Sequence, residues 1–404
     1  MTSLGEPELL TGPQPIVTRL RGWFFCAAML FSALFGVVYV TFPLFFLIFF
    51  NARFLRKLLD RLIGIWVIMP GCLMTYIFGT TVKVRGDFID CEQPALIIMN
   101  HRTRLDWLFF WSALYRMNPW LCTTEKITLK GVLKYLPGAG WAMQAVMYIF
   151  LDRDFKQDEE KLDKILTYFS EIGNKYQVLL FPEGTDKCPK ATERSRLYAE
   201  KNGLVHYDYL LHPRTTGFVH IVQTMRKTNN IKFIYDVTIG FGDAIVQSEV
   251  DFAVQGVCPK EVYYQVQRIP IEVVPKDDEA LAKWLVNLWA DKEKKLKQFY
   301  SLPRNVRTFD NTRGGQEYEM DEQQKLFMKV IITFWTINTL FWMYMFFESA
   351  LAFYYFFFVS AFFVIVQKVY GGFEFLTIKR FESDKRTGLA LPVGTAPPQT
   401  PEST

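Results

Sequence analysis

Residues 95–107 have the sequence Ala-Leu-Ile-Ile-Met-Asn-His-Arg-Thr-Arg-Leu-Asp-Trp. The apolar run 95–99 is typical of a buried β-strand, and the apolar periodicity of 107–115 is typical of a helix. The alternation continues along the chain, with strand-like runs at 178–181 and 233–239 and helical patterns at 159–171 and 278–299. Short strands that alternate with helices predict an α/β domain in which helices flank a mixed sheet.

The amino-acid composition is rich in apolar and aromatic residues. Of the 404 residues, 50% are hydrophobic and 17% are aromatic, and the 38 Phe are concentrated near the two ends. The net charge of +5 suits an anionic membrane surface or anionic ligands, and the chain lacks the basic runs typical of nucleic-acid binding. We therefore expect a lipid bilayer, and no nucleic acid, among its partners.

The six cysteines are spaced irregularly and form no Cys-x-x-Cys pair. This pattern predicts neither a zinc site nor a disulfide framework. We expect reduced, mostly buried thiols and no metal ion.

Apolar segments long enough to cross a membrane lie near both ends of the chain. Residues 23–50 carry no charge over 28 positions, and a helix of that length exceeds a hydrocarbon core of about 30 Å. The uncharged segment 62–82 contains Pro70, Gly71 and Gly79, so it could span, kink or turn back within one leaflet.

Near the other end, the apolar segments 330–347 and 349–367 are separated only by Glu348, which predicts a helical hairpin. The tail from Ser383 onward is rich in Pro, Thr and Gly, a composition typical of disorder. The predicted parts are N-terminal membrane helices (1–82), an α/β domain (83–325), a transmembrane hairpin (326–372) and a disordered polar tail (373–404).

Basic residues flank the C-terminal hairpin on both sides: Lys325, Lys329, Lys368, Lys379 and Arg380. Because cytosolic flanks carry the excess of Lys and Arg, we expect both flanks of this hairpin to be cytosolic. The segment 51–61, interpreted as a loop, is also basic. That charge conflicts with two spanning N-terminal helices and a cytosolic α/β domain, unless one of these helices dips into the membrane without crossing it.

The turn after the first strand brings His101 to the beginning of a helix, with Asp106 more than a turn further on. A carboxylate in that position can fix the imidazole tautomer and raise its basicity. The alternative is a helix-capping His and an unrelated surface Asp. The sequence contains no Gly-x-Ser-x-Gly motif, so a serine hydrolase would lack its usual nucleophile.

A second candidate element is Phe-Pro-Glu-Gly-Thr at 181–185, which again follows an apolar strand. Because ligands tend to bind at the carboxyl ends of strands in open α/β sheets, Glu183 and His101 are expected to face one crevice. A plain turn is the alternative.

Basic residues lie between these two elements, at Lys126, Lys130, Lys134 and Arg153. Their side chains are candidates for contacts with phosphate groups, and the glycines of 131–140 would let a ligand approach the backbone. Solvated lysines on a helix are the alternative.

Three motifs occur together in this order: Asn-His-x4-Asp at 100–106, Gly-Trp at 140–141 with Arg153, and Phe-Pro-Glu-Gly-Thr at 181–185. Their combination resembles the glycerolipid and lysophospholipid acyltransferase superfamily, including its 1-acylglycerol-3-phosphate acyltransferases. The stretches 100–107, 199–204 and 211–218 resemble the branch of lysocardiolipin and lysophosphatidylinositol acyltransferases. The resemblance covers nearly the whole chain.

The resemblance implies transfer of a fatty acyl group from acyl-CoA to a lysophospholipid hydroxyl, in a multi-pass protein of the endoplasmic reticulum with a cytosolic catalytic domain. His101 would be the general base and Asp106 would orient it. Glu183, with Gly184 and Thr185, would position the acceptor, and Arg153 would meet its phosphate. Acyl-CoA would be a co-substrate, with no bound cofactor, metal ion or covalent enzyme intermediate.

The chain departs from the pattern at Asp186, where many members that acylate glycerol 3-phosphate or lysophosphatidic acid carry Arg. A carboxylate would repel a dianionic phosphate but could accept hydrogen bonds from headgroup hydroxyls, which favours lysophosphatidylinositol or a lysocardiolipin-like acceptor. Alternatively, Asp186 points to solvent and Arg153 sets selectivity. Two further hypotheses are acylation of lysophosphatidic acid and a catalytically silent lipid-binding protein. The sequence does not indicate an oligomeric state.

Overall fold

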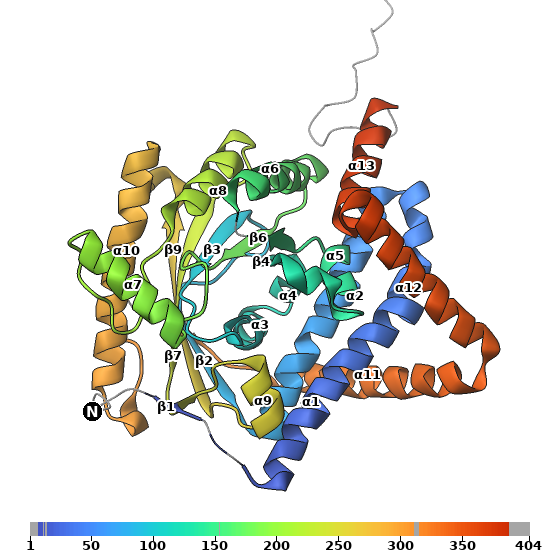
Figure 1. Ribbon diagram of the computed structural model, residues 1–404, viewed down its shortest axis with the longest axis horizontal. Coiled ribbons are helices and arrows are strands. Elements are labelled where there is room, and N and C mark those ends of the chain that lie inside the picture. The colour runs from blue at the N-terminus through green and yellow to red at the C-terminus, as the bar shows by residue number, and fades with distance from the viewer. Residues whose placement is uncertain (1–6, 11, 13, 153, 311–314, 388–404) are drawn as a thin grey trace, which may run out of the picture.

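The computed structural model describes residues 7–387 except 11, 13, 153 and 311–314. In this part of the chain an eight-stranded sheet has the strand order β10-β2-β9-β7-β3-β6-β4-β5 (Figure 1). Its strands are β2 Thr81–Gly86, β3 Ala95–Met99, β4 Glu125–Lys130, β5 Ile149–Leu151, β6 Gln177–Leu180, β7 Phe233–Phe241, β9 Glu261–Pro270 and β10 Gln316–Tyr318. A separate parallel pair joins β1, Glu8–Leu9, to β8, Ala244–Ile245.

The sheet is mixed, which confirms the predicted fold class. The neighbouring strands β7, β3, β6, β4 and β5 run parallel. Strand β9 runs antiparallel to β7 and parallel to β2, and β10 runs antiparallel to β2. Every residue of the central strand β3 is buried, which explains why its sequence is continuously apolar rather than alternating.

Helices cover both faces of the sheet, and alternate residues of β3 enter two different cores. Ile97 and Met99 pack in the core formed with α2 and α3, whereas Leu96 and Ile98 pack in the core formed with α6, α8 and α10. The helices of this domain are α3 Asp106–Met117, α4 Leu121–Thr124, α5 Ala139–Ala145, α6 Phe155–Ile172, α7 Pro189–Lys201, α8 Thr215–Lys227, α9 Glu249–Gln255 and α10 Asp278–Ser301.

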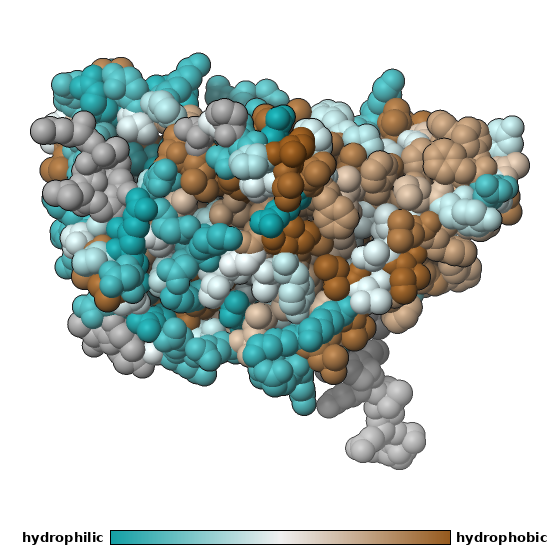
Figure 2. Space-filling model, turned by 90° about the horizontal axis from the view of Figure 1, so that it is seen from below, coloured by the Kyte–Doolittle hydropathy of each residue, from teal (hydrophilic) through white to brown (hydrophobic). Residues whose placement is uncertain are grey.

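Among the described residues, four apolar helical segments are long enough to cross a membrane. The first contains α1 Ile16–Phe35, the π-helix Gly36–Thr41 and the 3₁₀-helix Phe42–Phe49, and the second contains α2 Ala52–Leu73 and the π-helix Met74–Phe78. The third and fourth are α11 Glu322–Glu348 and α12 Ala350–Tyr370, which meet at Ser349. Figure 2 shows the apolar surface gathered on the side of the molecule where these helices lie.

The two pairs of apolar helices differ in how far the protein covers them. In their most apolar windows, 56% and 67% of the N-terminal pair are buried inside the molecule, against 11% and 22% of α11 and α12. The N-terminal pair therefore packs largely against the protein itself. Helix α2 runs without interruption through Pro70 and continues into the π-helix that ends at Phe78. Most of the predicted segment 62–82 therefore forms one continuous helix, and β2 begins at Thr81.

The interpretation of 51–61 as a basic loop is wrong, because this segment is the first part of α2. Arg56 and Asp60 are buried, and Asp60 Oδ1 lies 2.8 Å from Lys126 Nζ of β4. These side chains anchor α2 to the sheet. Their charges are therefore not a simple indicator of which side of the membrane the segment occupies.

The disorder predicted for 373–404 is wrong for its first part, where α13 spans Phe373–Arg386. Phe373 stacks on Phe45 with ring centroids 4.2 Å apart, and Phe381 packs edge-on against Tyr168 of α6 at 5.2 Å. These aromatic contacts offset the entropy cost of ordering a segment that is otherwise rich in charge. Residues 388–404 lie outside the described residues.

Candidate active site

The loop between β3 and α3 carries His101 at the carboxyl edge of the sheet. Asn100 fixes this loop to the neighbouring strand β7, because its side chain donates to the Ile239 carbonyl at 3.2 Å and accepts from the Ile239 N–H at 2.9 Å. The loop therefore leaves the sheet in one defined direction. Asp106 is the first residue of α3. The prediction that it lies more than a turn inside the helix is therefore wrong.

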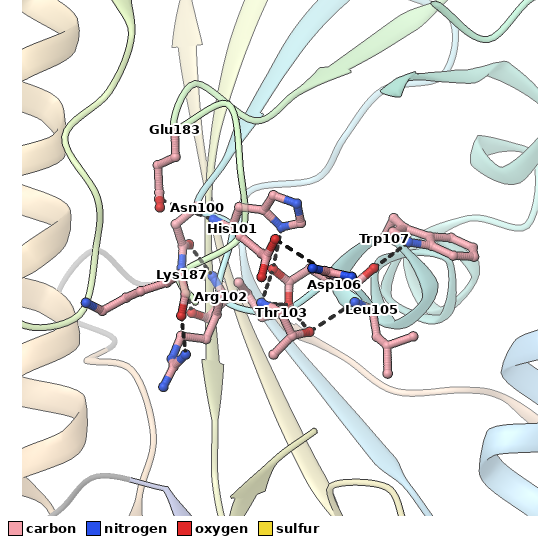
Figure 3. Close-up of polar contacts among 12 residues, drawn as sticks. Asn100, His101, Arg102, Thr103, Leu105, Asp106, Trp107, Glu183 and Lys187 are labelled. Carbon is pink, nitrogen blue, oxygen red and sulfur yellow. Dashed lines mark hydrogen bonds and ion pairs between the residues drawn. The ribbon is translucent and has the colours of Figure 1, made fainter. Parts of the chain in front are cut away.

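His101 and Asp106 form a close pair, with 3.0 Å between His101 Nδ1 and Asp106 Oδ2 (Figure 3). The Thr103 N–H donates to both carboxylate oxygens, and the Thr103 hydroxyl donates to Oδ1 at 2.8 Å. Because a carboxylate only accepts, the Asp106 contact places the proton on Nδ1 and leaves the Nε2 lone pair free. The His101 side chain is 16% exposed, and its ring stacks on Phe181 at 4.3 Å.

Glu183 approaches the same loop from the other side and contacts the main chain. Its Oε1 accepts from the His101 N–H at 3.2 Å and its Oε2 from the Leu211 N–H at 3.1 Å, while the Trp289 indole donates to Oε1 at 3.3 Å. Burial raises the pKa of Glu183 to about 7. This position favours a role in holding the surrounding loops, and the direct contact of Glu183 with an acceptor stays a prediction.

Helix α10 supplies the Trp289 side chain that completes this arrangement. Lys292, one turn further along α10, forms a buried ion pair with Asp236 of β7, at 2.6 Å. The pair holds α10 on the sheet and thereby fixes the position of the indole.

The turn after Glu183 is shaped by Gly184 and closed by Asp186. Gly184 has φ +72°, and a Cβ at this position would lie 3.2 Å from Arg214 Cδ, so both the backbone and the space favour glycine. Thr185 Oγ1 donates to Asp186 Oδ1 at 3.5 Å. Asp186 is buried, and its Oδ2 accepts from Gln247 Nε2 at 3.0 Å, so the alternative in which this side chain points to solvent is wrong.

Both loops open into one cavity of about 1520 Å³. Its apolar wall comes from α1, α2, α3 and α5 and includes Phe25, Met29, Trp66, Trp107, Trp111 and Met143. The basic side chains that line it are Arg104, Lys130, Arg194, Arg214 and Lys283. One cavity thus offers His101, an apolar surface and several cations, a combination that suits a ligand with both a long apolar chain and phosphate groups.

The basic residues that were predicted to contact phosphate groups lie in different environments. Lys130 is exposed at the end of β4 and lines the cavity, and Lys134 Nζ donates to the Gly371 carbonyl at 3.1 Å. The phosphate contact suggested for Lys126 is wrong, because this side chain is buried against Asp60. Arg153 lies outside the described residues.

The structure adds three residues that the sequence did not indicate as site residues: Arg104 and Arg214, which line the cavity, and Gln247, which donates to Asp186. Arg104 and Arg214 stand inside the motif stretches, where their charge was the available signal. Gln247 lies 61 residues beyond its partner Asp186, so no local pattern indicates it. No group of His, Cys, Asp and Glu that could hold a metal ion occurs within the described ranges.

Comparison with known proteins agrees with this arrangement. The acyltransferase family matches residues 81–242, and the family described as acyltransferase C-terminus matches residues 253–342. The chain is 43% identical to lysophosphatidylinositol acyltransferase 10 of Caenorhabditis elegans over 326 residues, which are 80% of this chain and 83% of the relative. It is 37% identical to lysocardiolipin acyltransferase 1 of Gallus gallus over 362 residues, 89% of this chain and 94% of the relative.

These matches place the chain, whose helix-flanked sheet carries a His–Asp pair at the carboxyl edge of its strands, in the acyltransferase family. Its relatives include lysophospholipid acyltransferases, and its apolar helices fit a membrane-associated protein. The crystal structure of the 1-acyl-sn-glycerophosphate acyltransferase from Thermotoga maritima matches with a TM-score of 0.42 and 13% identity, over 71% of this chain and 97% of that chain.

Proposed function

We propose that this protein transfers a fatty acyl group from acyl-CoA to a free hydroxyl of a lysophospholipid. The observation that carries the proposal is the His101–Asp106 pair in a cavity with an apolar wall and several basic side chains. The volume of about 1520 Å³ exceeds the roughly 300–1,000 Å³ of ordinary small-molecule pockets, as two lipid-like substrates require.

In the proposed reaction, His101 Nε2 takes the proton from the acceptor hydroxyl as its oxygen attacks the thioester carbonyl carbon. The new ester C–O bond forms and the C–S bond breaks. The CoA sulfur leaves as a thiolate and takes the proton back from the imidazolium. Asp106, which accepts from Nδ1–H, favours the tautomer that starts this cycle and stabilises the positive charge that develops on His101.

We propose an acceptor whose phosphate is a diester, such as lysophosphatidylinositol or a lysocardiolipin-like lipid. The names of the two relatives support this choice, and so does a carboxylate at Asp186 on the cavity wall. A phosphomonoester carries up to two negative charges, so the same carboxylate disfavours it more strongly.

For the membrane, we propose a multi-pass protein of the endoplasmic reticulum with the catalytic domain facing the cytosol. Strand β10, before α11, pairs with β2, and α13, after α12, contacts α6 through Lys385 and Glu171 at 2.7 Å. Both flanks of the C-terminal pair thus belong to one folded body, which supports placing them on the same side. At the other end, Phe25 of α1 packs on Phe252 of α9, and α2 leads directly into β2.

This arrangement also removes the conflict over the basic segment 51–61. Asp60 in the first part of α2 lies 2.8 Å from Lys126 of β4, so the segment 51–61 stays on the same side of the membrane as the catalytic domain. The N-terminal pair of helices then dips into the membrane without crossing it. Epitope tags between residues 310 and 324 and after Lys379 should be equally accessible in selectively permeabilised cells. Protection of only one tag would contradict the proposed topology.

The activity is tested with protein purified in detergent, one acyl-CoA and a panel of lysophospholipids that includes lysophosphatidic acid. We expect transfer to lysophosphatidylinositol or a lysocardiolipin, and no transfer by His101→Ala. Faster acylation of lysophosphatidic acid than of every diester would favour the biosynthetic enzyme instead. A wild-type protein that binds these lipids but acylates none would indicate a silent lipid-binding protein.

A further inference from the structure

Arg104 stands in the same loop as His101, and its side chain enters the cavity. Its backbone is held on both sides, because its N–H donates to the Gln247 carbonyl at 3.1 Å and its carbonyl accepts from the Trp107 indole at 2.7 Å. The side chain itself is 52% exposed. The guanidinium is thus carried on a fixed backbone and is exposed enough to bind an anionic ligand.

Asp186 is the side chain that faces Arg104. Arg104 Nε lies 3.5 Å from Asp186 Oδ1, and this guanidinium has no other hydrogen bond or ion pair within the part of the chain that the structure describes. The Asp186 carboxylate is in turn fixed through Oδ2 by Gln247 Nε2 at 3.0 Å. The contact through Nε leaves both terminal nitrogens of Arg104 available, which is the fork that binds a phosphate through two hydrogen bonds.

We propose that Arg104 binds the phosphate of the lysophospholipid acceptor and that Asp186 is a positioning residue that aims Arg104 and tunes its charge. The inference rests on the proposed function and deepens it by naming the cation that recognises the acceptor. The repulsion by the Asp186 carboxylate is about twice as strong for a dianionic monoester as for a monoanionic diester. Compared with Arg104 alone, the pair therefore shifts the preference towards phosphodiesters.

The loop geometry connects this contact to the chemistry. Arg102 NH1 donates to the Lys187 carbonyl at 3.2 Å, and the Lys187 N–H donates to the His101 carbonyl at 2.9 Å. The loops that carry His101 and Asp186 are thus tied to each other. A phosphate held by Arg104 would place the glycerol hydroxyl of the acceptor within reach of an imidazole that stands only three residues away in the same loop.

The test compares steady-state kinetics of wild type, Arg104→Gln, Arg104→Lys and Asp186→Asn with lysophosphatidylinositol, lysophosphatidic acid and one acyl-CoA. Loss of a charge-assisted hydrogen bond should raise the KM for lysophosphatidylinositol about tenfold or more in Arg104→Gln and less in Arg104→Lys, with the KM for acyl-CoA unchanged. Arg196→Gln is the matched charge control, because Arg196 is paired with Glu193 and Glu200 on α7 outside the cavity lining.

Asp186→Asn should shift the ratio of kcat/KM values towards lysophosphatidic acid by about three- to tenfold, because the counter-charge of Arg104 is lost. In the Arg104→Gln background the same substitution should have much less effect on that ratio, since the two residues act as one unit. Thermal unfolding of each variant establishes that it is folded.

Two outcomes would overturn the inference. A rise in the KM for acyl-CoA alone in Arg104→Gln would assign Arg104 to the phosphates of the donor. An equal effect of Asp186→Asn with and without Arg104 would mean that Asp186 acts on the acceptor independently of Arg104. A wild-type protein that acylates no lysophospholipid would refute the proposed function itself, which is a different result from either of these.

Discussion

Asp106 and Glu183 are two buried carboxylates beside the same histidine, and they bind different parts of it. Asp106 follows β3 and accepts from the His101 ring, whereas Glu183 follows the neighbouring strand β6 and accepts from the His101 main chain. The second oxygen of Glu183 and the Trp289 indole extend its contacts to Leu211 and α10. Asp106 is therefore placed to influence proton transfer, and Glu183 is placed to hold three segments together.

The two carboxylates therefore have different expected roles, Asp106 in proton transfer and Glu183 in stabilising the structure of the site. A change on the ring side should alter kcat and leave the fold intact, because the backbone contacts persist. A change on the main-chain side should alter stability first and turnover only through the position of His101. Each experiment below tests one side of this comparison.

The largest expected effect belongs to His101→Ala. A general base typically contributes about 10²–10⁴-fold to rate, so kcat should fall by that factor while thermal unfolding is nearly unchanged. The matched control is His220→Ala, which removes another histidine 3.0 Å from a carboxylate, Asp163, and neither of these two residues lines the cavity. Retention of more than about a tenth of wild-type turnover by His101→Ala would refute the proposed base.

Asp106→Asn should come next, with a loss of kcat close to that of His101→Ala. An amide can donate to Nδ1 and so favour the tautomer with its proton on Nε2, which cannot accept a proton from the acceptor. The Thr103 contacts to Oδ1 allow the amide oxygen to keep its place at the start of α3. If kcat stayed near wild type while stability fell, Asp106 would resemble Glu183 and the comparison would fail.

Much of this site follows from the local sequence. The apolar run of β3 predicts the strand, and the spacing of His101 and Asp106 predicts their contact. The turn after β6 predicts that Glu183 lies at the same edge of the sheet as His101. These are interactions between residues close in sequence or between adjacent parallel strands. Periodicity and turn chemistry reveal them for that reason.

The rest depends on contacts between distant segments, which periodicity does not encode. Lys126 resembles a solvent-exposed lysine until α2, 66 residues earlier, brings Asp60 against it. Trp289 reaches Glu183 over a separation of 106 residues. In α13 a few buried aromatic side chains outweigh a charged composition, so composition alone predicts disorder where a helix forms.

Glu183→Gln tests the main-chain side of the comparison. The amide has one acceptor oxygen for donors that two oxygens serve in wild type, so we expect a loss of about 1–3 kcal/mol in the free energy of unfolding. Turnover should fall less than in Asp106→Asn. Denaturant unfolding and steady-state kinetics on the same preparations measure both effects.

Glu293→Gln is the matched control, because Glu293 also accepts from main-chain N–H groups, those of Asp208 and Leu210, without contacting His101. Both variants should lose stability, but only Glu183→Gln should also impair turnover. Equal turnover in the two would mean that the His101 main-chain contact does not position the ring.

The smallest expected effect is a pH dependence of stability that belongs to Glu183. Burial raises its pKa in the folded protein to about 7 from a usual value of 4.5. Between these values the folded chain binds a proton that the unfolded chain releases, so this group makes the free energy of unfolding fall as pH rises. Its contribution is fully present below pH 4.5 and is lost as pH passes 7.

Other buried acids have the same sign, since burial also raises the pKa of Glu125 and of Glu374 to about 7. The useful quantity is therefore the difference in unfolding free energy between wild type and Glu183→Gln, measured by denaturant titration at pH 5, 6, 7 and 8. Because glutamine does not titrate, the advantage of wild type should be greatest at pH 5 and should shrink towards pH 8. A difference that grows with pH would mean that the His101 and Leu211 N–H groups stabilise the ionised carboxylate more than burial destabilises it. Glu183 would then be a charged partner of the His101 loop, and the contrast with Asp106 would be one of geometry alone.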